Sequence, residues 1–246
     1  EEEQIQSFSL KNSEIAKILI DKQFESKFSK HQVQEIDLNK INEVQLTRLF
    51  ICKMNNFTKD QLNMNCVTQI LPKIPNNIMI CLLENREGDL TKEQIPAINI
   101  NNDIIAAILL INRASDISKD QIQKINFFGD SNVQKEIKKR KPEYTTLYYI
   151  KRIHRYYDFS EDQFNKCIKY DCILNIIEIL NENLEHKISD ENFKKIPINQ
   201  LYQRIDKNKF SSFFNKYYSK FSQEQIMQLD TNEPFIANLI ISNNLF

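Results

Sequence analysis

The segment from Lys135 to Arg155 holds the residues best suited to bind a polyanion. It contains eight Lys or Arg against two Glu, in a chain whose formal net charge is zero. Tyrosines interleave with these cations, so the segment could contact phosphates while aromatic rings stack on unpaired bases. The alternative is a solvated helix face whose tyrosines pack inward, since charge runs usually serve solvation. The candidate binding residues are Lys138, Lys139, Arg140, Tyr148, Tyr149, Lys151, Arg152 and Arg155. A second basic aromatic stretch, residues 207–220, adds support for nucleic acid.

Histidines and cysteines show no pattern typical of a catalytic or metal site. His154 and Asp158 stand four residues apart, and Cys167 and Cys172 follow them. Structural zinc sites typically combine two tight pairs of Cys or His ligands, which this segment lacks. Nucleophilic catalysis would need the fold to bring a Cys to a His, and no flanking motif supports such a pair. We therefore expect no catalytic residue, no cofactor and no metal site, and a chain that is not an enzyme.

The scarcity of glycine narrows the function classes further. The chain contains only Gly88 and Gly129. Phosphate-binding loops, nucleophile elbows and dinucleotide turns need glycine where φ is positive or where the backbone approaches a ligand closely. Hairpin-rich β folds also depend on Asn-Gly or Asp-Gly turns, and neither dipeptide occurs here. An α fold is the simplest interpretation.

One short phrase recurs seven times and organises the chain. It consists of an apolar residue, Ser or Thr, any residue, usually an acid, then Gln and another apolar residue, as in Phe57-Thr58-Lys59-Asp60-Gln61-Leu62. The hydroxyl can cap a helix while the Gln side chain accepts from the amide of the capping residue, which forms a capping box. The two apolar residues can form a hydrophobic staple, and the acid suits the positive end of the helix dipole. The copies begin at residues 28, 57, 90, 117, 159, 188 and 221.

The spacing of these seven helix starts predicts helix pairs. Successive starts lie 27 to 33 residues apart, except for one interval of 42 residues after residue 117. Each interval has room for a short first helix and a longer apolar second helix. We expect the second helices over residues 43–52, 78–83, 104–111, 172–180 and 234–241, with caps near Asn39, Asn102, Asp171 and Asn232. Pro234 suits the first turn of the last one.

The long fourth repeat and the two ends need separate interpretation. We expect Asp130 and Ser131 to begin an extra helix that Pro142 ends, followed by another helix over residues 144–157. Residues 201–220 are predicted to divide into two helices. Asn12 is predicted to cap a helix that ends near Phe24, so that residues 1–27 form a partial repeat. No linker-like composition interrupts the chain, and residues 1–246 are predicted to form a single domain.

Composition indicates a soluble protein in a reducing compartment. Hydrophobic residues make up 41% of the chain and charged residues 27%, and no run approaches the roughly 20 apolar residues that span a bilayer. The acidic start shows no secretory signal. Five cysteines scattered through apolar stretches suggest buried, reduced thiols rather than disulfides. We expect a cytoplasmic location.

The phrase that begins at Leu90 carries a family resemblance. Leu90-Thr91-Lys92-Glu93-Gln94-Ile95-Pro96-Ala97-Ile98 resembles the opening of a TAL-effector repeat, a DNA-reading helix pair. In that family two adjacent loop residues face the base, which would align here with Asn101 and Asn102, Asn39 and Lys40, Asn199 and Gln200, or Asn232 and Glu233. The family's glycine-rich loop is missing, and the repeat spacing here varies. Repeats of the mitochondrial termination-factor type open similarly, and bacterial effectors often carry divergent solenoids, which implies that secretion into a host cell is possible.

These observations predict an all-α protein, a right-handed-type α-solenoid of about seven helix-pair repeats with a longer fourth repeat. The first functional hypothesis is a non-enzymatic scaffold that recognises a protein partner through the solenoid surface. The second is a nucleic-acid-binding repeat protein that uses residues 135–157. The third is an enzyme whose site forms only in three dimensions.

Overall fold

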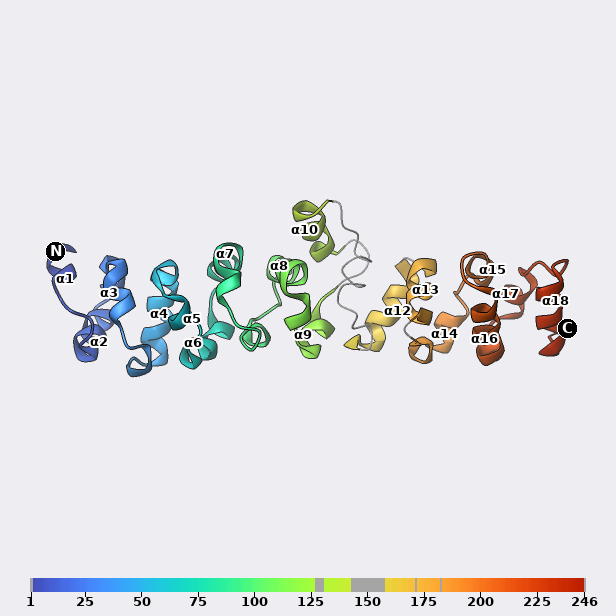
Figure 1. Ribbon diagram of the computed structural model, residues 1–246, viewed down its shortest axis with the longest axis horizontal. Coiled ribbons are helices and arrows are strands. Elements are labelled where there is room, and N and C mark those ends of the chain that lie inside the picture. The colour runs from blue at the N-terminus through green and yellow to red at the C-terminus, as the bar shows by residue number, and fades with distance from the viewer. Residues whose placement is uncertain (1, 127–130, 143–157, 171, 182, 246) are drawn as a thin grey trace. The chain divides into compact units, whose positions relative to one another are not determined.

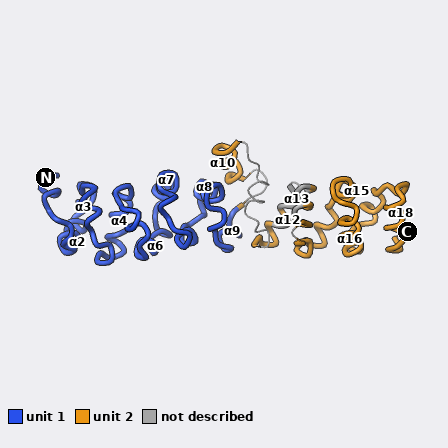
Figure 2. The backbone as a smooth tube through the Cα atoms, viewed as in Figure 1, with its two compact units in different colours: residues 1–125 blue, residues 126–246 orange. Residues whose placement is uncertain are grey.

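The computed structural model is all-helical over the residues that it describes, which are 2–126, 131–142, 158–170, 172–181 and 183–245. These residues form 17 α-helices and short three-ten turns, and no strand occurs among them (Figure 1). The prediction of an all-α protein is confirmed. The chain divides into two compact units, residues 1–125 and 126–246 (Figure 2).

Unit 1 contains short and longer helices. Its short helices are α1 (Glu2–Gln6), α3 (Lys30–Glu35), α5 (Lys59–Leu62), α6 (Asn65–Ile70) and α9 (Lys119–Lys124). Its longer helices are α2 (Ser13–Asp21), α4 (Glu43–Lys53), α7 (Asn76–Arg86) and α8 (Asp103–Arg113). In the first two repeats α2 packs against α4, and further along α7 packs against α8, so long helices of successive repeats are neighbours.

Unit 2 contains the described part of the long repeat and the last three repeats. Its helices are α10 (Asn132–Arg140), α12 (Glu161–Tyr170), α13 (Cys172–Asn181), α14 (Asp190–Phe193), α15 (Ile198–Tyr202), α16 (Lys207–Tyr217), α17 (Gln223–Met227) and α18 (Pro234–Ser242). The predicted extra helix is therefore present as α10, and residues 201–220 do divide between α15 and α16. The helix predicted over 144–157 lies outside the described residues.

Four of the long helices bury a narrow apolar stripe. In α4 the stripe is Leu46, Leu49 and Phe50, and the same spacing recurs in α7, α16 and α2. Positions i, i+3 and i+4 share one face of a helix, so each of these four helices turns one edge into its unit. Helix α8 differs, because all its residues from Ile105 to Ile111 are buried.

The predicted capping boxes are present at five of the seven phrases. Each serine or threonine hydroxyl accepts from the amide of the Gln three residues later, and the Gln side chain accepts from the capping residue's amide, at 2.8 to 3.2 Å. The five capping residues are Ser29, Thr58, Ser118, Ser160 and Ser222. The sequence therefore identified these helix starts correctly.

Two phrases depart from the predicted capping box. At Ser189 the third position is Asn192, whose amide donates to the Ser189 hydroxyl at 2.9 Å, and the hydroxyl caps no backbone amide. At Thr91 the Gln94 side chain accepts from the Thr91 amide, but no α-helix follows. Pro96 lacks an amide hydrogen and its ring conflicts with a helical carbonyl, so only the three-ten turn Ile95–Ala97 forms.

The second helices match the predicted ranges, whereas two of their caps were predicted at the wrong residue. Asn102 caps α8 as expected, and its side chain accepts from the Ile104 amide at 3.0 Å. The cap of α4 is Asn42 instead of Asn39, because Asn42 forms a full capping box with Gln45. The capping residue of α18 is Glu233, not Asn232, and Pro234 occupies the first turn as predicted.

The glutamine of the phrase has a second partner that the sequence did not reveal. Its side-chain oxygen belongs to the capping box, and its amide nitrogen donates across to backbone carbonyls of the preceding repeat. Gln32 donates to Ile5 and Phe8, Gln61 to Val33 and Ile36, Gln121 to Ile95 and Ile98, and Gln225 to Phe193 and Ile196, at 2.7 to 3.3 Å. These glutamines are only 3 to 7% exposed. We call this set of bonds the glutamine ladder.

The ladder also shows that the first helix is a further copy of the phrase. Gln32 donates to the carbonyls of Ile5 and Phe8, which stand one and four residues after Gln4. Val33 and Ile36, the acceptors for Gln61, stand one and four residues after Gln32. Helix α1 thus has the place of a first helix, and residues 1–27 hold both helices of a repeat where the sequence predicted only one.

A three-ten turn closes most repeats just before the next phrase. These closing turns are Glu25–Lys27, Met54–Asn56, Glu87–Asp89, Ala114–Asp116, Glu185–Lys187 and Tyr218–Lys220. A cation of the following repeat binds several of them. The Arg86 guanidinium donates to the Met54 and Phe57 carbonyls at 2.8 and 2.9 Å, and that of Arg113 donates to the Glu87 and Leu90 carbonyls at 3.0 and 3.1 Å.

Candidate interaction surfaces

Helix α10 carries the described part of the predicted basic site. Its apolar side, Val133 and Ile137, is buried, while Lys138 and Lys139 are exposed. Arg140 is partly buried and forms an ion pair with Glu136, one turn earlier. Two of the three described candidates therefore face solvent as cations, and the third already has a carboxylate partner.

The remaining candidates of that site lie outside the described residues. They are Tyr148, Tyr149, Lys151, Arg152 and Arg155, and His154 of the metal hypothesis belongs to the same segment. The grouping of all eight residues into one surface stays a prediction.

The second basic aromatic stretch uses its cations and rings inside unit 2. Lys207 pairs with Glu233 at 2.5 Å, Lys216 with Glu185 at 3.0 Å and Lys220 with Asp190 at 2.7 Å. Tyr217 is buried, and its ring centroid lies 5.0 Å from that of Phe193. Lys207 and Lys216 thus join neighbouring repeats, whereas Lys220 and Tyr217 make these contacts within one repeat.

A polar groove lies beside the closing turn Met54–Asn56 in unit 1. It has a volume of about 300 Å³ and is formed by the end of α4, the turn, and α7 of the next repeat. Asn55 and Asn56 contribute amide groups to it, and Ile51 and Ile78 contribute apolar surface. Side-chain amides both donate and accept, so such a groove can pair with the backbone of a bound peptide.

Unit 2 has a groove at the corresponding turn. Its volume is about 440 Å³, and its lining includes His186 and Lys187 of the closing turn Glu185–Lys187 together with Phe159 and Glu161 of the preceding phrase. His186 occupies the place in its turn that Asn55 occupies in the other. Both units therefore have a groove at a closing turn, which is formed with α7 of the next repeat in unit 1 and with the preceding phrase in unit 2.

The middle residue of each closing turn is exposed and varies between repeats. These residues are Ser26, Asn55, Gly88, Ser115, His186 and Ser219. These residues lie outside the recurring phrase, so the phrase does not mark them. The available signal was position, since each turn ends directly before a copy of the phrase.

The described cysteines differ from the expected buried thiols. Cys52 is exposed, and Cys66 and Cys81 are partly buried; all three are free thiols. Partial burial, followed by the nearby Glu25 carboxylate, raises the pKa of Cys52, and burial raises the pKa of Cys66. A raised pKa disfavours the nucleophilic thiolate. Among the described residues, no group of three or more His, Cys, Asp or Glu is placed to hold a metal ion.

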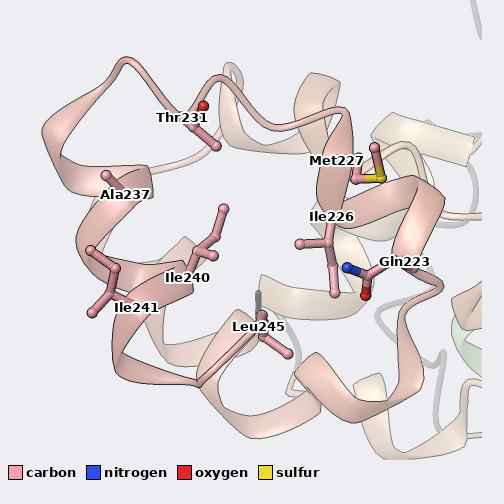
Figure 3. Close-up of a pocket in the computed structure, with 8 residues that line it drawn as sticks. All are labelled: Gln223, Ile226, Met227, Thr231, Ala237, Ile240, Ile241 and Leu245. Carbon is pink, nitrogen blue, oxygen red and sulfur yellow. The ribbon is translucent and has the colours of Figure 1, made fainter.

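An apolar pocket lies between α17 and α18 (Figure 3). Its volume is about 240 Å³, and Ile226 and Met227 face Ala237, Ile240 and Ile241 across it. Met227 is 75% exposed and Ile241 is 53% exposed, which is unusual for large apolar side chains. An apolar hollow with exposed apolar residues at its rim is a feature of protein-binding surfaces.

Comparisons with known protein families, with curated proteins and with solved structures gave no match to this chain. The fold and these surfaces are therefore the basis for assigning a function. Among the described helices, none has the length and apolar content needed to cross a membrane.

Proposed function

We propose that the chain is a right-handed-type α-solenoid that serves as a non-enzymatic scaffold for a protein partner. The glutamine ladder supports the solenoid, since Gln32, Gln61, Gln121 and Gln225 each join their repeat to the one before it through the same pair of bonds. Counting residues 1–27, this proposal has eight repeats. Solenoids of this kind present extended surfaces made of side by side repeats, and partners bind along them.

The observation that carries the proposal is the groove beside the closing turn. A groove lies beside a closing turn in each unit, and the exposed middle residue of that turn is Asn55 in one and His186 in the other. A framework that recurs within the chain, with different residues at equivalent places, is suited to binding successive segments of an extended peptide. The grooves combine amide and apolar lining, as peptide sites commonly do.

The basic residues favour a protein partner over nucleic acid, because several of them already form ion pairs. Lys207 and Lys216 form ion pairs with carboxylates of other repeats, Lys220 pairs with Asp190 of its own repeat, and Arg140 pairs with Glu136. Nucleic-acid affinity comes chiefly from cations that neutralise phosphates, so cations already paired contribute less.

Nucleic-acid binding through residues 135–157 is the second candidate, because Lys138 and Lys139 are exposed on α10. Fluorescence anisotropy with single-stranded DNA and RNA across a salt series tests it. The scaffold proposal expects no salt-dependent binding and no difference between wild type and the double variant Lys138→Glu, Lys139→Glu. Tight binding at low salt that this variant abolishes would favour nucleic acid.

Site-specific photocrosslinking tests the protein-binding proposal. A photoreactive phenylalanine analogue at Asn55 or at His186 is expected to crosslink a protein other than this chain in an extract of the cells that express it. Excess wild-type chain should compete for that crosslink, and the variant Asn55→Arg, His186→Glu should not. The same analogue at Lys59, exposed on α5, is the matched control. Equal crosslinking from all three positions, or competition by both competitors, would contradict the proposal.

A further inference from the structure

Three side chains surround the ammonium group of Lys207 at the start of α16. The carboxylate oxygen Oε1 of Glu233 accepts from Lys207 Nζ at 2.5 Å. The same nitrogen lies 5.8 Å from the ring centroid of Tyr202, on α15, and 5.5 Å from that of Phe235, on α18. Both distances are within the roughly 6 Å over which an aromatic face attracts a cation. We call Glu233, Tyr202 and Phe235 the aromatic cage.

Contacts that do not involve Lys207 hold the cage in shape. The rings of Tyr202 and Phe235 are stacked, with centroids 5.9 Å apart and planes inclined at 13°. The Tyr202 hydroxyl donates to Oε1 of Glu233. The Tyr202 ring also packs edge to face against the buried ring of Phe210, with centroids 5.1 Å apart. The two rings and the carboxylate are therefore preorganised around the place of the cation, which reduces the cost of binding one.

The cage is accessible from solvent. The Lys207 side chain is 59% exposed and that of Glu233 is 31% exposed, while Tyr202 and Phe235 are partly buried. Both hydrogen bonds to Glu233 use Oε1, and among the described residues no group donates to Oε2. An ion pair at the surface contributes little to stability, because water solvates both charges when they separate. Lys207 can therefore leave the cage at small cost.

An ion pair without rings joins repeats elsewhere in the chain, so joining repeats does not explain the cage. In unit 1 Lys73 pairs with Glu43 of the preceding repeat, and within the described part of the chain no ring lies over the Lys73 ammonium. On α16 itself Lys216 pairs with Glu185 and lies over the ring of Tyr217, but both of these partners are buried. The aromatic cage differs in combining two rings, a carboxylate and access from solvent.

We propose that the aromatic cage binds an alkylammonium group, for which Lys207 is the internal competitor. In the complex, the incoming cation replaces the Lys207 ammonium beside Glu233 and the two rings, and Lys207 turns to solvent. The carboxylate and the aromatic faces favour a cation over a neutral group, and the alkyl substituents of the ligand pack against the rings. The hydrogen bond to Glu233, followed by the one to Tyr202, raises the pKa of Lys207, as expected where the surroundings favour the charged form.

The ligand chemistry is shared by a lysine side chain, a methylated lysine side chain and a small quaternary amine. The cage lies apart from the grooves beside the closing turns, so the inference does not depend on the partner proposed for those grooves.

NMR titrations with n-butylammonium, which resembles a lysine side chain, and with tetramethylammonium test the proposal. The variant Lys207→Ala removes the internal competitor. It should bind the probes on the order of tenfold more tightly than wild type, with saturable shifts of the ring protons of Tyr202 and Phe235. Sodium chloride at equal ionic strength controls for screening. Lys216→Ala is the matched control, because it removes a paired lysine of α16 outside the cage, and it should bind as weakly as wild type.

Two double variants locate the binding. Adding Phe235→Leu or Glu233→Gln to Lys207→Ala removes one ring or the charge of the cage, and each should abolish most of the gain. No saturable shift in Lys207→Ala would overturn the proposal. Equal affinity of Lys207→Ala and Lys216→Ala, or binding that survives Phe235→Leu, would overturn it as well.

The two probes distinguish the sources of the ligand. Tighter binding of n-butylammonium supports a lysine side chain, and tighter binding of tetramethylammonium supports a methylated or quaternary ammonium. Circular dichroism with a thermal melt verifies that each variant is folded. If Lys207→Ala does not fold, Lys207→Gln replaces it, because the amide removes the charge and keeps a donor for Glu233. Failure here leaves the crosslinks at the closing turns unaffected, so it is distinguishable from failure of the scaffold proposal.

Discussion

A single side chain, the glutamine of the repeated phrase, both starts a helix and binds the previous repeat. Gln61 has both roles. Its side-chain oxygen accepts from the Thr58 backbone amide at 3.0 Å, and its side-chain nitrogen donates to the Val33 carbonyl at 3.0 Å. A capping box alone accepts either Gln or Glu at this position. The second role needs an amide hydrogen, which a glutamate carboxylate does not have. This explains why six of the seven predicted copies, and Gln4 besides, carry Gln in sequences that otherwise vary.

Sequence could predict the first role of the glutamine and not the second. The capping box lies within four residues, so spacing reveals it. The acceptor carbonyls lie 23 to 32 residues earlier in the chain, and backbone carbonyls carry no residue signature. The extra copy at Gln4 was detectable, because Gln4-Ile5 precedes Gln32-Val33 by one repeat length. The phrase does not identify this copy, because its capping residue is not a Ser or Thr.

At the residue scale, Glu233 gives a pH-dependent prediction. Its carboxylate accepts from the Lys207 ammonium and the Tyr202 hydroxyl, and these bonds lower the pKa of Glu233 while the carboxylate raises the pKa of Lys207. The carboxylate's contribution is therefore present above its unfolded pKa and is lost as pH falls through the folded value. The lysine's contribution is lost as pH rises through its raised pKa.

The variant Glu233→Gln should consequently melt at a lower temperature than wild type at neutral pH. The difference should shrink as the pH falls through the depressed pKa of Glu233, because the wild-type carboxylate is then protonated too. Thermal melts followed by circular dichroism across pH measure this, with Glu224→Gln on α17 as the matched control. A difference that is constant across pH would show that the ion pair is not responsible.

At the scale of elements, the closing turns and the cations that bind them form a second junction between repeats. Arg113 donates forward to Asp116 at 2.7 Å and back to the turn Glu87–Asp89, and Arg86 acts likewise on the turn before it. Sequence predicted the long helices because their apolar stripes are local. The closing turns escaped prediction, because a three-residue turn has no periodicity and its stabilising cation comes from another repeat.

The variant Arg113→Lys tests this junction. An ammonium cannot contact Asp116 and two carbonyls in the fixed planar geometry of a guanidinium. Charged hydrogen bonds of this kind contribute roughly 1.5 to 3 kcal/mol each at most, so a loss of about 1 to 3 kcal/mol in the free energy of unfolding is expected. Urea unfolding measures it, and Arg204→Lys at an exposed site is the control. If Arg113→Lys and Arg204→Lys change the free energy of unfolding equally, the hydrogen bonds of the Arg113 guanidinium do not stabilise the fold.

At the scale of the whole molecule, four phrase glutamines make the same pair of bonds to the preceding repeat, whereas the exposed middle residues of the closing turns differ. The ladder glutamines are buried, and the middle residues of the closing turns are exposed. In such an array each repeat depends mainly on its neighbours. The sequence predicted the helices because their starts recur. It could not predict the grooves, since these form between residues of different repeats that share no motif.

The most direct test of this account is to replace each ladder glutamine by glutamate, one at a time, at Gln32, Gln61, Gln121 and Gln225, and to measure the free energy of unfolding. Glutamate keeps the capping-box acceptor and suits the helix dipole, but it sets a carboxylate against two backbone carbonyls. The ladder predicts a loss of at least about 1 to 3 kcal/mol at every site. The loss should diminish at low pH, where a protonated glutamate can donate again. Gln69→Glu, at an exposed position of α6, is the control. Unchanged stability in all four variants would contradict the ladder and leave the glutamines as helix caps only.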